Sequence, residues 1–385
     1  KRMPFIDRVV FSREREGIPY WNKFLQGYYD FSGISSDSFD QAVRISVEGE
    51  ASVSPEMKSK GIKLEASVGT ATRYFAFNWL DPVVGGGQVD AAGRERARKL
   101  RQAISIALDW EEFISIFANG RGIPAQGPIP PGIFGFRTGG EGINPIVYDW
   151  ADGAPRRKSI AAAKKLLAEA GYPDGREAKS GQPLVLYLDT TDRGPGDKPR
   201  LDWYRKQFAK LDVQLEIRGT DYNRFQEKVR KGAAQIFVWG WNADYPDPEN
   251  FLFLFHGAQS RAKFQGENAA NYANPEYDRL FEQVKHMENG PARQALIDRM
   301  LAILREDAPW SFGFHPKDYS LHHDWVANLK PNNMARNGLK YQKIDAVRRE
   351  RLRAEWNRPV LWPLGLLAVV LAASAAPAVV GWRRR

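Results

Sequence analysis

The chain has 385 residues, of which 43% are hydrophobic and 26% charged, a composition typical of a globular protein long enough for two domains. It contains no cysteine, which excludes disulfides, thiolate metal sites and a cysteine nucleophile within this stretch. The net charge is +10, but residues 346–385 hold eight Arg against only two acids, so the body of the chain lacks the basic stripe typical of nucleic-acid binding.

The first part of the chain is predicted to contain two strands followed by helices. Residues 9–11 (VVF) and 74–79 (YFAFNW) have the β-branched and aromatic character of strands. Apolar residues at helical spacing predict one helix over 95–118 and another over 157–170. The Gly- and Pro-rich residues 121–156 between them are expected to form a long ordered loop.

The middle of the chain alternates element types, which predicts an α/β sheet with parallel neighbours. We expect strands at 184–188, 213–217 and 235–239, helices at 200–210 and 222–231, and two later helices at 275–288 and 291–306. Ligands of such sheets bind beyond the carboxyl ends of the strands. The segment WGWNADYPDP, residues 239–248, is predicted to lie there.

The C-terminal tail has the features of a single membrane span. Residues 359–382 contain no charge and would span roughly 36 Å as a helix, with Trp362 and Trp382 near the two interfaces. The alternative is a buried core helix. Residues 346–358 are predicted to be a basic juxtamembrane linker, and Arg383–Arg385 favour a cytoplasmic C-terminal end.

Five segments, in this order and spacing, resemble the extracytoplasmic solute-binding proteins of family 5, the oligopeptide and dipeptide receptors of ABC transporters. They are Tyr74–Pro82 (YFAFNWLDP), Arg101–Asp109 (RQAISIALD), Lys164–Gly175 (KKLLAEAGYPDG), Trp239–Leu252 (WGWNADYPDPENFL) and Ala308–Phe314 (APWSFGF). The resemblance implies a two-lobed, periplasmic-binding-protein-like α/β fold that closes on its ligand by a hinge.

The resemblance also implies a division of the chain. Residues 1–73 would be a remnant of the N-terminal lobe, 74–317 the C-terminal lobe and 318–345 a return to the N-terminal lobe. The family's sequences begin well before Lys1, and no signal peptide is present, so we expect a fragment or a processed product.

The same resemblance suggests a ligand site around residues 240–245. Gly240, Trp241 and Asn242 match the strand that flanks a bound peptide backbone, and Asp244 matches the acid that binds the ligand's α-amino group. Tyr245 belongs to the same candidate set. A carboxylate in a closing cleft suits an ammonium ligand, although Asp244 could instead cap a turn or the helix beginning near Pro248.

Aromatic and polar residues nearby extend the candidate site. Trp239 and Trp241 flank a glycine and should share one face of an extended segment, with Trp241 assigned to the cleft and Trp239 to the core. Tyr74 and Asn78 match the crossing between lobes, which lines the cleft in similar proteins. Core packing is the alternative for the two tryptophans.

The sequence does not favour a catalytic or a metal site. Asp247 and Glu249 lie close to Asp244, as a glycosidase would require, but an acidic loop of this kind is more often a capped turn. Adjacent His322 and His323 would point to opposite faces of a strand. We therefore expect no catalytic activity, no metal and no cofactor.

The resulting expectation is the substrate-binding component of an ABC transporter that imports peptides. Its partners would be a peptide or other small solute, ABC permease subunits and the membrane, but no nucleic acid. It would be extracytoplasmic and anchored in the inner membrane by its C-terminal helix. The alternatives are a membrane-anchored sensor or transporter fusion subunit on the same fold, or a receptor for nickel, a sugar or another small solute.

Overall fold

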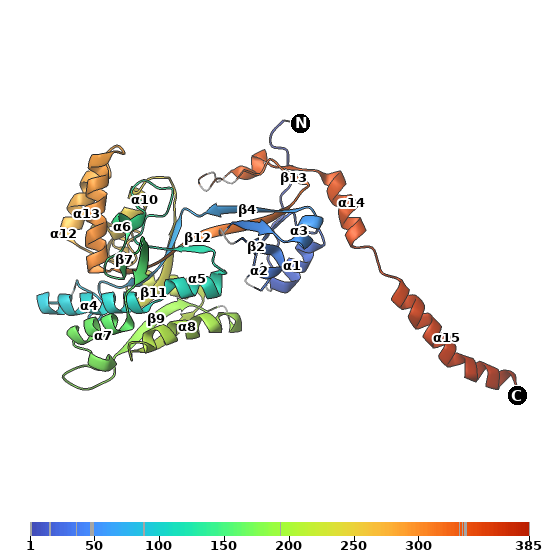
Figure 1. Ribbon diagram of the computed structural model, residues 1–385, viewed down its shortest axis with the longest axis horizontal. Helices are drawn as coiled ribbons and strands as arrows, with labels where there is room; N and C mark the ends of the chain where they lie inside the picture. The colour runs from blue at the N-terminus through green and yellow to red at the C-terminus, as the bar shows by residue number, and fades with distance from the viewer. Residues whose placement is uncertain are drawn as a thin grey trace. The chain divides into compact units, whose positions relative to one another are not determined.

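The chain forms two compact units, which are described separately (Figure 1). The computed structural model describes residues 2–14, 17–35, 37–46, 50–87, 89–192, 194–330, 332, 334 and 337–384. Lys1 and Arg385 lie outside these ranges. Unit 1 comprises Lys1–Glu65, Ser320–Pro331 and Asn337–Arg385, and unit 2 comprises Ala66–Tyr319 and Asn332–Arg336.

Unit 2 contains most of the regular structure. Its strands are β5 (Ala71–Phe77), β6 (Gly122–Pro124), β7 (Tyr148–Ala151), β8 (Ala154–Arg157), β9 (Val185–Thr191), β10 (Gln214–Thr220), β11 (Ile236–Asn242) and the first part of β12 (Trp310–His323). Its α-helices are α4 (Ala91–Ala107), α5 (Trp110–Ala118), α6 (Gly139–Gly142), α7 (Ile160–Glu169), α8 (Lys198–Ala209), α9 (Tyr222–Arg230), α10 (Glu249–Leu252), α11 (Arg261–Phe264), α12 (Pro275–Val284) and α13 (Pro291–Asp307).

A mixed sheet forms the centre of unit 2, with the strand order β12-β5-β11-β9-β10. β9 pairs in parallel with β10 and with β11, as the alternating strands and helices of the sequence predict. β5 pairs antiparallel with both β11 and β12. The predicted α/β architecture with parallel neighbours is therefore confirmed, and β5 joins the parallel part to β12.

The sheet has a hydrophobic core on each face, because successive side chains of a strand point to opposite sides. Phe237 and its partner Ala76 belong to one core, with side chains from α9, α12 and α13. Ile236 and its partner Phe77 belong to the other, with side chains from α4, α5, α7 and α8. Phe77 is fully buried, and burial of such a side chain contributes about 1.5–3 kcal/mol.

Three predictions for unit 2 need correction. The helix expected over 95–118 is two helices, because Leu108 is extended and Asp109 caps a new helix by accepting a hydrogen bond from the Glu112 backbone N–H at 2.9 Å. Residues 121–156 are not simply a loop but contain β6, α6 and the β7–β8 hairpin. The strand expected to end at residue 239 continues to Asn242, so the start of WGWNADYPDP is part of β11.

Unit 1 is built from shorter elements. They are α1 (Gly17–Leu25), β1 (Phe31–Gly33), α2 (Phe39–Ala42), β2 (Val43–Ile45), β3 (Ala51–Val53), α3 (Pro55–Ser59), most of β4 (Ile62–Val68), the end of β12, β13 (Val326–Ala327), β14 (Lys343–Ile344), α14 (Ala346–Trp356) and α15 (Trp362–Arg383). β1 pairs antiparallel with the end of β12. Residues 9–11 do not form the predicted strand, and all three side chains are exposed, Phe11 by 86%.

The predicted basic linker, residues 346–358, is largely the helix α14 and packs within unit 1. Trp356 lies 5.7 Å from the Trp325 ring, and Arg348 pairs with Asp324 at 3.0 Å. Asp345 caps the helix by accepting from the Arg348 backbone N–H at 3.0 Å. The positive charge that predicted a basic linker is therefore partly balanced by acidic residues that are distant in the sequence.

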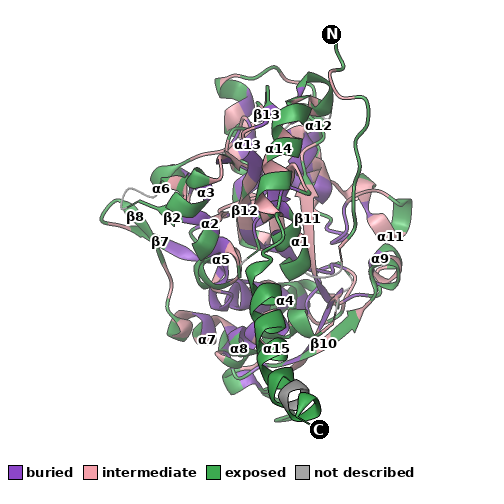
Figure 2. Cartoon of the chain, turned by 90° about the vertical axis from the view of Figure 1, so that its right-hand side faces the viewer, coloured by how far each residue is buried: buried purple, intermediate pink, exposed green. Residues whose placement is uncertain are grey.

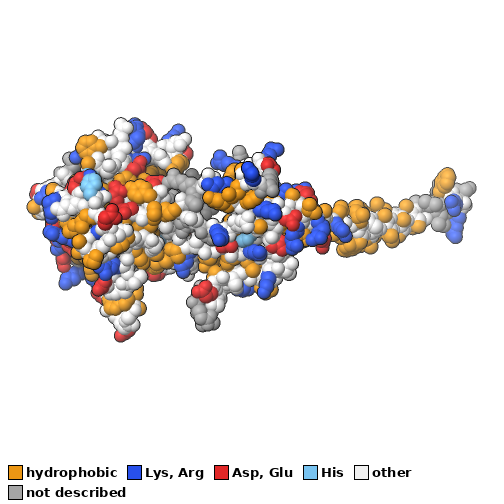
Figure 3. All heavy atoms as spheres, turned by 90° about the horizontal axis from the view of Figure 1, so that it is seen from above, with side chains coloured by type: hydrophobic (Ala, Val, Ile, Leu, Met, Phe, Trp, Pro, Cys, Tyr) orange, Lys and Arg blue, Asp and Glu red, His pale blue; other side chains and the backbone are white. Residues whose placement is uncertain are grey.

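The C-terminal helix α15 carries no buried residue among those described (Figure 2). By length and composition it is able to cross a membrane, with a mean hydropathy of 2.2. Figure 3 shows its hydrophobic side chains in orange, with basic side chains in blue near its ends. A core helix would be buried in the fold, so the core-helix alternative does not fit its exposure.

Candidate functional site

The strand β11 has one unpaired edge. Along one side it pairs with β5 over its whole length, from Ile236 to Asn242. Along the other side β9 pairs only with Ile236 and Phe237. In the part of the chain that the structure describes, residues 238–242 therefore have no strand on that second side.

The register determines which backbone groups face the unpaired edge. The N–H of Ala243 donates to Thr70 O at 2.8 Å, and the N–H of Asn78 donates to Gln235 O at 2.9 Å. In an antiparallel ladder, hydrogen-bonded pairs alternate, so the odd-numbered residues of β11 bond β5. The N–H and C=O groups of Gly240 and Asn242 consequently point to the unpaired edge, where an extended ligand can hydrogen-bond to them.

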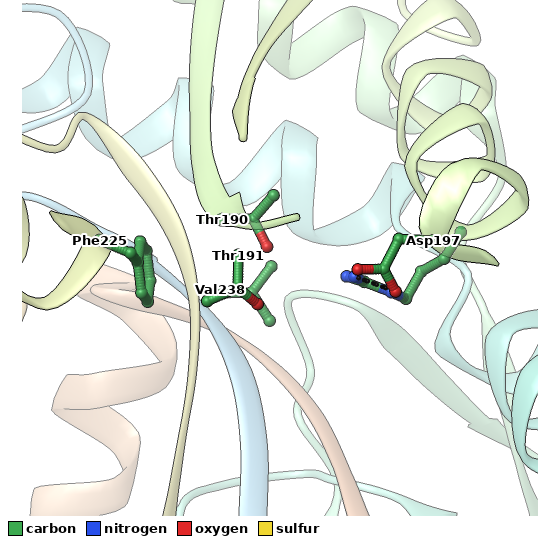
Figure 4. A pocket seen from close by; sticks show the side chains of 6 residues that line it. Thr190, Thr191, Asp197, Phe225 and Val238 are labelled. Carbon is green, nitrogen blue, oxygen red and sulfur yellow. Dashed lines mark ion pairs between the residues drawn. The ribbon is translucent and has the colours of Figure 1, made fainter. Parts of the chain in front are cut away.

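A cavity of about 280 Å³ opens beside this edge, where the carboxyl end of β9 diverges from β11 (Figure 4). This is the position at which ligands enter sheets with parallel strands. Asp197 and Arg200 form an ion pair of 3.1 Å on one side of the cavity. The cavity is lined by Thr190, Thr191, Asp197, Arg200, Phe225 and Val238. None of these six residues is predicted from the sequence, although the rule that ligands bind beyond the carboxyl ends of parallel strands indicates the place.

The loop after β11 exposes an acidic and an aromatic residue. Asp244 and Tyr245 are both exposed. The Tyr245 hydroxyl donates a hydrogen bond to the Glu249 carboxylate. Partial burial, followed by this hydrogen bond, raises the pKa of Tyr245 to about 12. Tyr245 therefore stays neutral at physiological pH, and its exposed aromatic ring directly follows Asp244 in the chain.

The conformation of this loop is held by Asn250, a residue that is not among the candidates predicted from the sequence. Asn250 is 2% exposed, and its Oδ1 accepts from Trp241 Nε1 at 3.2 Å and from the Asp244 backbone N–H at 2.8 Å. The Trp241 ring packs edge-on against Phe253 at 5.4 Å. The buried side-chain amide of Asn250 thus orients both Trp241 and Asp244, the aromatic and the acidic residue of the candidate site.

Asp247 has a structural role instead of acting as the second acid of a catalytic pair. Arg293, which is 3% exposed, donates to its two oxygens at 2.8 and 2.7 Å, and the Glu249 backbone N–H donates at 2.8 Å. Burial alone would raise the pKa of Asp247, but the hydrogen bonds from Arg293 and from the Glu249 backbone outweigh it and lower that pKa. This agrees with a capped turn.

Two predicted site residues lie in the core. Tyr74 is 1% exposed and stacks on Trp310 with ring centroids 3.4 Å apart. Asn78 is 3% exposed and donates to the carbonyls of Gly232 and Ala234 at 2.8 Å each. Their side chains are used in packing and hydrogen bonding within unit 2, and direct contact of either residue with a ligand stays a prediction.

The two tryptophans of the segment share one face, as the alternation of the strand predicts. Trp239 and Trp241 are both half-buried and pack against the core that contains Phe237. Trp239 lies 5.5 Å from Phe225, which also lines the cavity. The expected division, with Trp241 on the cleft and Trp239 in the core, stays a prediction.

The chain is similar to a known family and to curated proteins. The family model described as "Bacterial extracellular solute-binding proteins, family 5 Middle" matches residues 6–263. Among curated proteins, the heme-binding protein A of Haemophilus influenzae is 29% identical over 224 residues. The di/tripeptide-binding protein 2 of Pseudomonas aeruginosa is 24% identical over 250 residues. These matches cover 57% and 64% of this chain but only 37% and 43% of the relatives.

Solved structures show the same fold. A periplasmic binding protein DppA from Helicobacter pylori, in complex with the peptide STSA, has a TM-score of 0.65 at 19% identity, covering 85% of this chain and 55% of that one. The oligopeptide-binding protein AppA from Bacillus subtilis, in complex with a nonapeptide, has a TM-score of 0.64 at 17% identity, with coverages of 86% and 59%. The expected binding-protein fold is thereby confirmed.

Proposed function

The chain belongs to family 5 of the bacterial extracellular solute-binding proteins, and from this premise we propose that it captures peptides outside the cytoplasm and delivers them to the permease of an ABC transporter. The family is one of binding proteins, in line with the expectation of a protein without catalytic activity. Gly240 and Asn242 would pair with the peptide backbone, Trp241 and Tyr245 would provide aromatic contact surface, and Asp244 would bind the α-amino group.

One observation carries this proposal, namely the unpaired edge of β11 from Val238 to Asn242. Strand addition lets a receptor bind the backbone that all peptides share, whatever their side chains. An exposed carboxylate, Asp244, follows the edge directly and suits the ammonium group of a peptide. The cavity beside Val238 has room for a ligand side chain.

Calorimetry on the intact protein tests the proposal with a matched pair of ligands. We expect trialanine to bind and N-acetyl-trialanine, which lacks the ammonium group, to bind at least roughly tenfold more weakly. If neither peptide binds, peptide capture is wrong. Titration with nickel or with a neutral sugar in the same instrument then tests the alternative solutes.

We further propose that the protein is anchored in the inner membrane by α15. The helix is long and apolar, and Arg383 and Arg384 at its end favour a cytoplasmic location for that end. The residues between α14 and α15 number only five. Because α14 packs within unit 1, this connection would keep the receptor close to the membrane and to a permease.

A further inference from the structure

Arg73 lies directly over Gly240, the residue whose backbone faces the unpaired edge. The two are partners in the β5–β11 ladder, so their side chains occupy the same face of the sheet. A Cβ added to Gly240 would come within 2.7 Å of Arg73 Nη1 and 2.8 Å of its Cδ. The glycine therefore leaves the space that the Arg73 side chain occupies as it crosses β11.

The Arg73 side chain is half-buried, and its hydrogen bonds go to neutral acceptors. Nη1 donates to Thr72 O at 3.1 Å and to Trp241 O at 3.5 Å, and Nη2 donates to Asn242 Oδ1 at 3.2 Å. Among the described residues, no carboxylate forms an ion pair with it. Burial lowers the pKa of Arg73, and the charge of the nearby Asp318 carboxylate opposes this shift.

A partly desolvated cation with no carboxylate in ion-pair contact can accommodate a further anionic group, and a carboxylate is the group that best matches a guanidinium. A ligand strand added at the unpaired edge would have one residue opposite Gly240. That residue would direct its side chain to the face that carries Arg73, because opposed residues in a sheet share a face.

We propose that Arg73 is a specificity determinant, which selects ligands with a carboxylate on the residue that pairs with Gly240. The inference rests on the proposed function, since it assumes a peptide along β11. The carboxylate has two sources, an acidic side chain or the C-terminus of a short peptide. Asp244 and Arg73 would then recognise the positive and the negative group of one ligand.

Calorimetry on the intact protein with four peptide probes separates these sources. Trialanine amide carries no carboxylate, trialanine carries one at its C-terminus, and trialanine amides with Glu at position 2 or at position 3 carry one on a side chain. We expect at least one carboxylate-bearing probe to bind about tenfold or more tightly than trialanine amide. Arg73→Gln should abolish that difference, while the affinity for trialanine amide stays within about twofold.

Two further variants provide controls. Arg73→Lys keeps the charge without the planar fork and should retain part of the preference. Lys179→Gln removes the same charge from an exposed residue before β9 and should leave every affinity unchanged. If the wild-type protein binds all four probes equally, or if the preference persists in Arg73→Gln, the proposed role of Arg73 is wrong. Neither result would contradict the proposed function. A protein that binds no probe would overturn the proposed function as well.

Discussion

The indole N–H of Trp241 donates to the side-chain oxygen of Asn250, which lies 3.2 Å away and is almost completely buried. The same oxygen accepts from the Asp244 backbone N–H. The loop that carries the proposed amine-binding carboxylate is therefore held in place by a residue whose own side chain is withdrawn from solvent.

Substitution of Asn250 by Ala should loosen this loop. It leaves the Trp241 indole and the Asp244 backbone N–H without their acceptor, and an unsatisfied buried donor costs about 1–3 kcal/mol. Urea unfolding should show a loss of stability of this size, with weaker trialanine binding. Asn223→Ala, on the exposed face of α9, is the matched control and should stay within about 0.5 kcal/mol of wild type.

Asp244→Asn should weaken the binding of peptides with a free amine by at least roughly tenfold. Loss of one member of a desolvated charge pair typically costs ~2–5 kcal/mol, and tenfold is the low end of that range. Calorimetry with trialanine measures the effect, and N-acetyl-trialanine should be insensitive to the substitution. Asp152→Asn, in the β7–β8 turn, removes an equal charge from an exposed position. Unchanged trialanine affinity in Asp244→Asn would remove this residue from the site.

Gly240→Ala should disturb the site through sterics. The added Cβ would lie 2.9 Å from the carbonyl oxygen of Thr72, and it would also displace the Arg73 side chain. We expect a loss of about 1–3 kcal/mol in the free energy of unfolding, typical of overpacking. Gly33→Ala, in β1, meets no atom within 4 Å and should be neutral or slightly stabilising. Equal stability of the two variants would contradict the close packing of Arg73 on Gly240.

The sequence was sufficient for elements that depend on local pattern. The alternation of strands and helices from β9 to β11 follows from the sequence, because hydrophobic periodicity and turn residues are local signals. The pairing of Arg73 with Gly240 could not be predicted, because the register of strands 167 residues apart depends on the whole sheet. The burial of Asn78 and the Asp247–Arg293 pair also arise from long-range packing.

The membrane anchor should fail when charge is placed within α15. Leu367→Arg with Leu371→Arg puts two guanidinium groups in the apolar stretch, and each costs about 2.5–3.5 kcal/mol near the centre of a span. We expect the double variant to be released from membranes by alkaline carbonate, whereas the wild-type protein stays in the pellet. Val347→Arg, on exposed α14, should behave like the wild type. Release of the wild-type protein would exclude α15 as an anchor.

Acid should destabilise the fold through two buried histidines. His315 donates from Nδ1 to Ala71 O at 3.0 Å and His323 from Nε2 to Phe24 O at 2.9 Å, and both are fully buried. Burial lowers the pKa of each to about 4, from an ordinary value of 6.5. Between these values the unfolded chain binds more protons than the folded one, so stability is complete above about pH 6.5 and falls as the pH approaches 4.

Each histidine should therefore contribute up to about 1.4 kcal/mol per pH unit to the slope of stability in that window. Urea unfolding at intervals from pH 4.5 to 7.5 measures this slope, and His315→Gln and His323→Gln should each make it shallower. His286→Gln is the control, because this histidine is not buried and its loss should leave the slope unchanged. A slope that is the same in all four proteins would show that acid acts through other groups, such as the carboxylates whose pKa values are lowered by ion pairs.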